Sequence, residues 1–539
     1  MTTRHRTAAQ NADYSALPLR NDYGIKLKAF EIEQARTKTE KDELRKESGI
    51  NGQSAFSAVD SLDFPWSFPL DMMHVLFENI MPQLMLCWRG KYKNDKDDKG
   101  KDVTDRRTFV LSDTAWEEIK LEVAASNTMV PSQFALYVNS IDKKSYWTAE
   151  THSYFLMHLW PIIMKDRLPT PYYRHFVELS EITKVLVKIE MTQSEVDSLP
   201  AQLVKWVKDL EKVYYAWDMK YISSCTAPIH SLLHVAECVK RQSPLAMYWC
   251  FAMERYGGMV KRYAKNNRKQ VITAITNRII KEERIHQLAT LFSAEDDTSA
   301  KWWDTLRGKS PAYIASYSSR PAQEADYMPG ALLDAMTPQP YLLDPEVIKA
   351  IATLLSTRAY TDRDWQSGRS AVVDETYVQQ ICFTAWRAYR SDSDTGDQKY
   401  RIGRENGGGQ ATFRDASWAT YIQYEDKDRH TNRPVARWVQ VQKWGQIKLF
   451  LTFTWNNEDL SVAVVRAYQT TDWIAGIASP PQLLGRIDGS LLQVIGLDAL
   501  DAVAGRVTVL RNGHKKTIIF ETSGGALKAP AVEEVPSGG

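Results

Sequence analysis

The stretch Phe68-Pro-Leu-Asp-Met-Met-His-Val-Leu-Phe-Glu-Asn-Ile80 decides how the first half of this chain is expected to fold. Apart from Asp71, His74 and Glu78 it is almost entirely apolar, and the spacings of three and four residues put these side chains on one stripe of a helix. A polar stripe on a buried helix has to be satisfied by a hydrogen-bonding network, by a metal ion or by a phosphate held through a metal. The sequence therefore predicts a core helix with one chemically specialised face.

Both ends of this helix carry recognisable signals. Ser67 is expected as the N-cap, Pro69 suits the first turn, and Asp71 lies where the helix dipole favours an anion. Pro82 cannot donate a hydrogen bond to the carbonyl of Glu78, so a kink is expected just past the polar stripe. We therefore expect the helix to begin near Pro69.

The composition indicates an ordinary globular protein. The chain has 539 residues, of which 44% are hydrophobic and 25% charged, and this length is enough for about two to four domains. The net charge is +2, so DNA binding would have to come from local basic patches. The five cysteines form no Cys-x-x-Cys pair, and the N-terminus lacks the apolar segment of a signal peptide. No apolar run has the length of a membrane-spanning helix, and we expect a protein of a reducing compartment without a structural zinc finger.

Periodicity divides the chain into a helical body and a β-rich C-terminal region. Helical spacing of apolar residues recurs through the first half. From Ala411, short runs of alternating β-branched and aromatic residues predict a small β-barrel or sandwich of about 110 residues. The expected parts are a polar N-terminal arm with a charged helix at 1–60, a helical domain at 61–292, a helical or irregular connector at 293–410, the β-rich domain at 411–522 and a disordered tail at 523–539.

A series of motifs resembles the cut-and-paste DNA transposases of the CACTA (En/Spm-like) superfamily, especially the Plavaka-type elements of fungi. Each motif alone is weak, but their order and spacing are specific, and the resemblance covers roughly residues 45 to 290 and more loosely the C-terminal region. The series consists of the Asp-x-x-His motif at 71–74, Trp147-Thr-Ala-Glu150, Tyr172-Tyr-Arg-His-Phe176, Ile229-His-Ser-Leu-Leu-His234 and Phe251-Ala-Met-Glu-Arg-Tyr256.

The resemblance implies a fold and a chemistry. The helical body would be the all-helical insertion and the final catalytic helix of an RNase H-like transposase, in which two Asp and one Glu hold two Mg²⁺ or Mn²⁺ ions. Glu254 would be the catalytic Glu and a metal ligand, His74 would lie close to the scissile phosphate, and Asp71 would orient His74 or cap the helix. The implied partner is DNA at the transposon ends, with a possible homo-oligomer, no membrane association and a nuclear location.

This chain departs from the family at the other two carboxylates. In the family both catalytic Asp residues lie upstream of the Asp-x-x-His motif, near a pair of cysteines. Only about 70 residues precede Asp71, they contain no Cys, and Asp60 and Asp63 resemble the family's linker. We therefore expect a truncated, catalytically incomplete transposase, or alternatively a domesticated, non-catalytic protein that interacts with chromatin or other proteins. The surface around His74 and Glu254 would then be apolar and exposed.

The residues taken by themselves leave simpler interpretations open. Asp71 and His74 could satisfy one another inside a helical core. Glu254 could be an ordinary residue at a helix start, paired with Arg255 or Lys261.

His230 and His234 have the spacing of a zinc hydrolase, with Glu254 twenty positions on. Ser231, however, stands where the general-base Glu belongs, and we interpret the two histidines as core residues.

A basic stretch follows Glu254. Between Lys261 and Arg284, Arg and Lys alternate with Tyr263 and Asn residues, and a helix with these side chains on one side could neutralise phosphates. The alternative is a solvated helix face. The candidate DNA-binding residues are Lys261, Arg262, Lys265, Arg268, Lys269 and Arg278.

Overall fold

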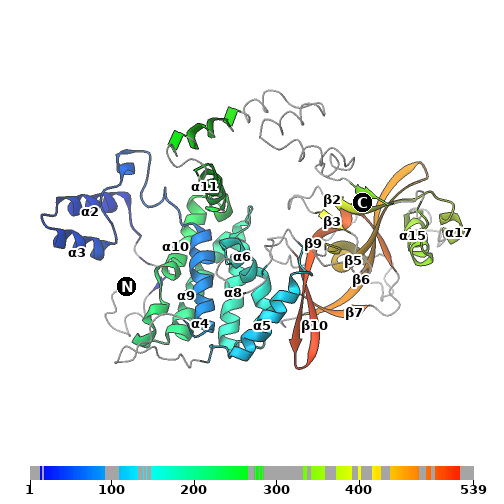
Figure 1. Ribbon diagram of the computed structural model, residues 1–539, viewed down its shortest axis with the longest axis horizontal. Helices are drawn as coiled ribbons and strands as arrows, with labels where there is room; N and C mark the ends of the chain where they lie inside the picture. The colour runs from blue at the N-terminus through cyan, green and yellow to red at the C-terminus, as the bar shows by residue number, and fades with distance from the viewer. Residues whose placement is uncertain are drawn as a thin grey trace. The chain divides into compact units, whose positions relative to one another are not determined.

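In the computed structural model the chain forms two compact units (Figure 1). Unit 1 contains Met1–Ile119 and Lys143–Phe251, and unit 2 contains Lys120–Asp142 and Ala252–Ser523, with short C-terminal pieces assigned to each. The residues that the structure describes are 13–14, 17, 19–91, 108–131, 138, 141–142, 147–264, 272–273, 275–277, 279–281, 283–284, 332–336, 341–358, 372–390, 399–401, 416–426, 438–472, 481–486 and 492–521.

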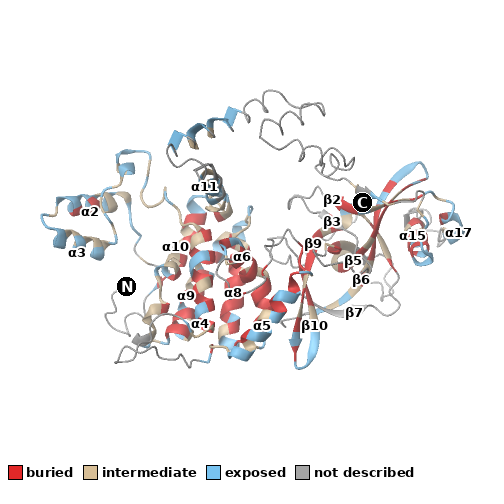
Figure 2. Cartoon of the chain, viewed as in Figure 1, coloured by how far each residue is buried: buried red, intermediate tan, exposed pale blue. Residues whose placement is uncertain are grey.

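The N-terminal arm contains two capped helices instead of one. In α2 (Asp22–Gln34) the side chain of Asn21 accepts a hydrogen bond from the amide of Gly24 at 2.8 Å. In α3 (Lys38–Ser48) Thr37 caps the first turn in the same way. Neither helix buries many residues, which agrees with the charged character that the sequence predicts for this region (Figure 2).

Unit 1 is a helical body with an aromatic core. Trp88 and Trp160 are fully buried, and Trp88 makes edge-on contacts with Trp160 and with Phe176. Within this unit, Figure 2 shows buried residues along the packed helices, including α4 and α8. The helical elements of this unit are η2 (Ala55–Ala58), η3 (Met73–Ile80), α4 (Met81–Trp88), α6 (Ala149–Tyr154), η5 (Phe155–Leu159), α7 (Trp160–Ile163), α8 (Thr170–Leu186), α9 (Gln193–Leu210), η6 (Glu211–Tyr215), η7 (Met219–Ser224), α10 (Ala227–Arg241) and η8 (Leu245–Met247).

Three of these elements, η3, η5 and η6, are π-helices, and two of them end just before a proline. Pro82 is the second residue after η3, and Pro161 is the second residue after η5. A proline cannot donate the usual hydrogen bond four residues back, and its ring crowds that carbonyl. The preceding turn is widened to bonds five residues back, from Met81 to Leu76 and from Trp160 to Phe155. The chain thus accommodates Pro82, where a kink was expected, through a π-to-α transition.

Two helices cross the boundary between the units. They are α5 (Asp113–Ser126) and α11 (Phe251–Ala264). None of the described helices combines the length and the apolar character that crossing a bilayer requires.

Unit 2 contains a ten-stranded antiparallel sheet. Its strands follow the order β1-β2-β5-β4-β9-β10-β7-β6-β8, with β3 beside β2 and a further pairing of β5 with β6. The turns Asn456–Asn457 and Asn512–Gly513 join β5 to β6 and β9 to β10, and all four residues have positive φ, as tight two-residue hairpins require. The strands are β1 (Leu332–Ala335), β2 (Thr384–Arg390), β3 (Lys399–Arg401), β4 (Trp418–Asp426), β5 (Trp438–Trp455), β6 (Glu458–Asp472), β7 (Pro481–Arg486), β8 (Gln493–Gly496), β9 (Leu500–Arg511) and β10 (His514–Glu521).

The predicted division into a helical body and a C-terminal β region is confirmed, but the antiparallel sheet is larger than the predicted small barrel or sandwich of about 110 residues. The path of the sheet begins at β1 and ends at β8, and the further pairing of β5 with β6 connects the two ends of the run β5-β4-β9-β10-β7-β6. It also begins before residue 411, because β1, β2 and β3 come from the expected connector. In addition, α15 (Pro345–Arg358) packs Ile351 and Leu355 into the same hydrophobic core as Leu451 and Val462 of the sheet. Near α15 lies the short helix α17 (Glu375–Val378). The predicted tail at 523–539 lies outside the described residues.

Candidate functional site

The polar stripe begins at Asp71, whose side chain caps the helix. Helical residues start at Met72 and not near Pro69. One carboxylate oxygen of Asp71 accepts a hydrogen bond from the amide of Met73 at 3.3 Å, and the other accepts from the amide of His74 at 3.2 Å. The expected cap, Ser67, instead accepts a hydrogen bond from the amide of Asp63. The carboxylate of Asp71 outcompetes the more distant hydroxyl because it reaches the free N–H groups of the first turn directly.

Asp71 also joins two segments that are far apart in the sequence. Its Oδ1 accepts a hydrogen bond from the amide of Cys250 at 2.9 Å, across 179 residues, and the thiol of Cys250 makes a further hydrogen bond to the same carboxylate. Burial alone would raise the pKa of Asp71, but the hydrogen bonds from His74 and Cys250 outweigh it and lower the pKa overall. Asp71 is therefore an ionised, well-satisfied carboxylate that fixes the start of η3 to the residue just before α11.

His74 lies between two carboxylates. Its Nδ1 is hydrogen-bonded to Oδ2 of Asp71, and its Nε2 lies 3.7 Å from Oε2 of Glu78. The side chain of His74 is 45% exposed and that of Glu78 is 42% exposed, whereas Asp71 is 17% exposed. The stripe thus has one sheltered end and one open end, and His74 can be reached from solvent. The mutual Asp71–His74 pair of the simpler interpretation is present, although it is not enclosed in a core.

Asp71, His74 and Cys250 form a group of possible metal ligands. Each offers one ligand atom, and the three atoms lie within 4.8 Å of one another. Among the residues that the structure describes, this is the one such group, and Glu254 does not belong to it. Sequence reasoning missed Cys250, which it treated as one of five scattered thiols. The available signal was its position directly before the motif at 251–256.

This donor set does not fit the predicted Mg²⁺ or Mn²⁺ ions. Both metals prefer oxygen ligands, whereas two of the three donors here are a thiol and an imidazole. Glu254, the expected ligand, lies in the first turn of α11 and is exposed. The described residues therefore offer no assembly of carboxylates that would hold a pair of such ions.

The histidine pair on α10 differs from its prediction. Nε2 of His230 and Nε2 of His234 are 3.3 Å apart, but His230 is exposed and His234 half-buried, so they are not core residues. The buried face of α10 is formed by Ile229, Leu232 and Val235, among others, and the two histidines fall beside it. Burial lowers the pKa of both imidazoles, and in His230 the neighbouring His234 lowers it further. Among the described residues no third ligand joins this pair, so a zinc hydrolase site is absent from this part of the chain.

The structure describes only part of the predicted DNA-binding stretch. Lys261 is an exposed residue of α11, and Arg262 belongs to the same helix, although its side chain is not described. Lys265, Arg268, Lys269 and Arg278 lie outside the described residues.

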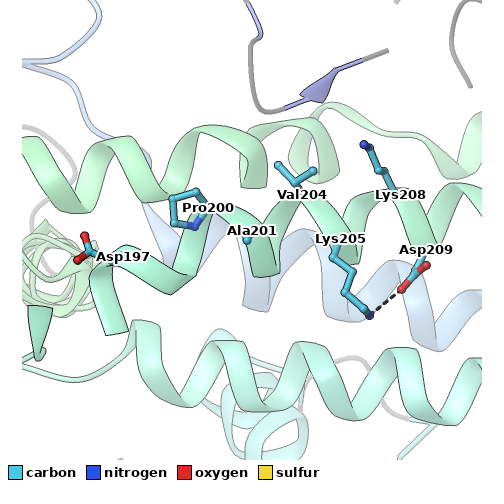
Figure 3. Close-up of a pocket in the computed structure, with 7 residues that line it drawn as sticks. All are labelled: Asp197, Pro200, Ala201, Val204, Lys205, Lys208 and Asp209. Atoms are coloured by element: carbon cyan, nitrogen blue, oxygen red, sulfur yellow. Dashed lines mark hydrogen bonds and ion pairs between the residues drawn. The ribbon is translucent and has the colours of Figure 1, made fainter. Parts of the chain in front are cut away.

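A surface hollow beside α9 carries none of the predicted chemistry. The residues that line it all come from this one helix (Figure 3). Its most prominent cation, Lys205, is already paired with Asp209 at 2.8 Å and with Glu178 at 2.7 Å. We therefore assign the hollow no site. The lining residues are Asp197, Pro200, Ala201, Val204, Lys205, Lys208 and Asp209.

No protein-family model, curated protein or solved structure matches the chain. The function therefore has to be inferred from the motifs and from the geometry of the Asp71–His74–Cys250 group. Asp71 and Glu78 hold the imidazole of His74 between two carboxylates. Within the group, the thiol of Cys250 lies within reach of both other donors.

Proposed function

We propose that this chain is a CACTA/Plavaka-like transposase relative that binds DNA and is catalytically incomplete by itself. The observation that carries the proposal is the hydrogen bond from the amide of Cys250 to Asp71. It joins the first motif of the series to the residue that precedes the last motif, Phe251–Tyr256. A helical insertion that opens at one motif and closes at the other would bring its two ends together in this way.

In this proposal the helical body corresponds to the insertion and the final helix of an RNase H-like catalytic domain. His74, open to solvent, would face a scissile phosphate, and Glu254 would be the closing carboxylate. Lys261 and Arg262 would contact the DNA backbone at transposon ends in the nucleus, where the chain would act alone or as a homo-oligomer. Only one of the three carboxylates of the two-metal chemistry is matched in this chain, so DNA binding without strand transfer is the expected activity.

The second candidate function is a non-catalytic interaction protein derived from a transposase. The observation that favours it is exposed apolar surface next to the motifs. Met253 on α11 is 69% exposed and Met247 on η8 is 62% exposed, and Phe68 and Tyr256 are also exposed. Large apolar side chains exposed in this way are common where a partner binds.

Measuring DNA affinity as a function of salt tests the proposal. The variant Lys261→Ala/Arg262→Ala should weaken binding to unrelated duplexes by similar factors, because backbone contacts do not report sequence. The slope of log affinity against log salt should fall by about 2, one for each lost phosphate contact. The matched control is Lys515→Ala/Lys516→Ala, a basic pair on β10 that should leave the slope unchanged.

Two results would contradict the proposal. If the wild-type chain binds no duplex at low salt, the non-catalytic interaction protein is the remaining candidate function. Nicking of DNA with Mg²⁺ or Mn²⁺ that Glu254→Gln abolishes would show instead that the chemistry is complete, and the chain would have to be described as an active enzyme.

A further inference from the structure

We propose that Asp71, His74 and Cys250 bind a thiophilic divalent transition metal ion, with Zn²⁺ as the natural occupant. This inference goes beyond the proposed function and does not depend on DNA binding. The three ligand atoms lie within 4.8 Å of one another, close enough to surround one ion after small side-chain movements. Carboxylate, imidazole and thiolate are the three donors that zinc takes in proteins, and the thiolate excludes Mg²⁺ as a preferred occupant.

The hydrogen bonds of the group show where the ion would lie. The imidazole Nδ1 of His74 and the thiol of Cys250 both make hydrogen bonds to the carboxylate of Asp71. A cation placed among these three groups replaces the two bridging protons. The thiol proton goes to solvent, and the proton on Nδ1 moves to Nε2 through the other tautomer of the ring.

The surroundings hold two of the ligands in place. The carboxylate of Asp71 is fixed by backbone amides of Met73, His74 and Cys250, none of which has to be displaced by the metal. Glu78 lies 3.7 Å from Nε2 of His74, where it would accept the proton that this nitrogen carries once Nδ1 binds the metal. A carboxylate behind a ligating histidine fixes its tautomer and strengthens it as a donor.

Three protein ligands leave one position of a tetrahedral ion open. Structural zinc sites are closed by four protein ligands, whereas three ligands with a water molecule are typical of sites that bind or activate a small ligand. The open position would face the solvent-exposed side of His74, which is 45% exposed. We therefore expect an exchangeable water there, or an anionic oxygen such as that of a phosphate.

Titration of the chelator-treated full-length chain with Co²⁺ in the absence of DNA tests the site. Wild type should bind one equivalent and show the ultraviolet charge-transfer band of a cobalt–thiolate bond, which Zn²⁺ should abolish by competition. Cys250→Ser should remove this band and weaken binding at least about 100-fold, since losing a ligand costs no less than losing its supporting group. This variant keeps the backbone amide that Asp71 accepts from, and circular dichroism would verify its fold. Glu78→Ala, at an exposed position, should weaken binding about 10-fold.

Matched controls separate this group from the other candidate ligands. Cys382→Ser removes an exposed thiol of unit 2 and should change neither band nor affinity. His230→Gln/His234→Gln removes the pair on α10 and should also leave both unchanged. The proposal is overturned if wild type shows no thiolate band, if the band survives Cys250→Ser, or if it disappears with the α10 pair.

Discussion

His74 and the histidines of the helical core are both imidazoles in unit 1, but their neighbours make them chemically different. His74 is half-exposed and has a carboxylate at each ring nitrogen. His175 is buried, stacks on Trp206 at 4.4 Å and places its Nε2 3.0 Å from the carbonyl of Trp206, while its Nδ1 has no hydrogen-bond partner. His152 is buried as well, and its Nδ1 also lacks a partner. Residue type alone therefore does not distinguish a reactive histidine from a packing one.

The largest expected difference between the surroundings of His74 and of His175 is in the free energy of unfolding. It should appear when Trp206, the ring on which His175 packs, is removed. Trp206 is fully buried, and its Nε1 donates a hydrogen bond to the carbonyl of His175 at 2.9 Å. Trp206→Ala should lower the free energy of unfolding by about 3–5 kcal/mol, because it leaves a large cavity in the core. His74→Ala should change it by less than about 1 kcal/mol. Urea denaturation compares the two, and equal losses would remove the distinction.

The second difference is a loss of stability in acid. Burial lowers the pKa of His152 to about 4, and it lowers that of His175 to about 4 although the hydrogen bond to the Trp206 carbonyl opposes it. An unfolded histidine has a pKa of about 6.5. Between these values the unfolded chain takes up protons that the folded chain cannot, so stability is full above pH 6.5 and falls as the pH drops towards 4, by at most about 3 kcal/mol for each histidine.

Unfolding measured between pH 7 and 4.5 checks this dependence. His175→Gln should be less stable at pH 7 but should show a shallower decline, and His152→Gln should behave similarly. A decline that is as steep in the double variant as in wild type would assign the acid sensitivity to other groups.

The third comparison concerns Asp71, which acts both as a cap and as a link. Asp71→Ala removes hydrogen bonds to the first turn of η3 and to Cys250, and should cost about 2 kcal/mol. Asp71→Asn keeps an oxygen that can accept from these amides, and should cost less. Amide hydrogen exchange at Cys250 should be faster in the Ala variant. An unchanged exchange rate would mean that this link does not hold the segment in place.

The smallest expected change in stability comes from a helix cap that makes local contacts, and it is the reference against which Asp71→Ala is compared. In α9 the Thr192 side chain accepts from the amide of Glu195, and Glu195 bonds back to the amide of Thr192. Thr192→Ala should cost about 1 kcal/mol, and Gln202→Ala on the exposed side of the same helix should cost almost nothing. If Asp71→Ala costs no more than Thr192→Ala, the long-range contact of Asp71 adds nothing to its cap.

The parts of the site that the sequence predicts are those that depend on local spacing. Asp71, His74 and Glu78 lie in one row because their spacing is helical. The position of Cys250 directly before the motif at 251–256 marks it in the sequence, but local spacing cannot place it beside Asp71, because that contact results from the packing of the helical body across 179 residues. The helical spacing of α10 would also have predicted that its two histidines are not core residues. Ile229, Leu232 and Val235 define the buried face of this helix, and both histidines lie off that face.

In the β region, too, local sequence patterns predict the presence of strands but not how distant segments pair. Its strands were predicted from alternation as short runs, but residues Trp438–Trp455 form one continuous 18-residue strand, β5. The strands β1 and β2 lie before the region of clear alternation, and they are held in the sheet by pairing with later strands. Their assignment needs tertiary contacts that no local pattern contains.

The wide π-helical turn before Pro82 has a consequence for insertions and deletions. A π-helix accommodates an extra residue in a turn, and each residue of an ordinary helix rotates the next by about 100°. Deleting one residue between His74 and Pro82 would let the turn close as an α-helix, and His74 would rotate relative to the buried side of α4 by much less than that angle, because the deletion removes the residue that the wide turn accommodates. The same deletion in an ordinary α-helix would swing the imidazole by the full angle of about 100°, so the wide turn makes the direction of His74 tolerant of the loss of one residue.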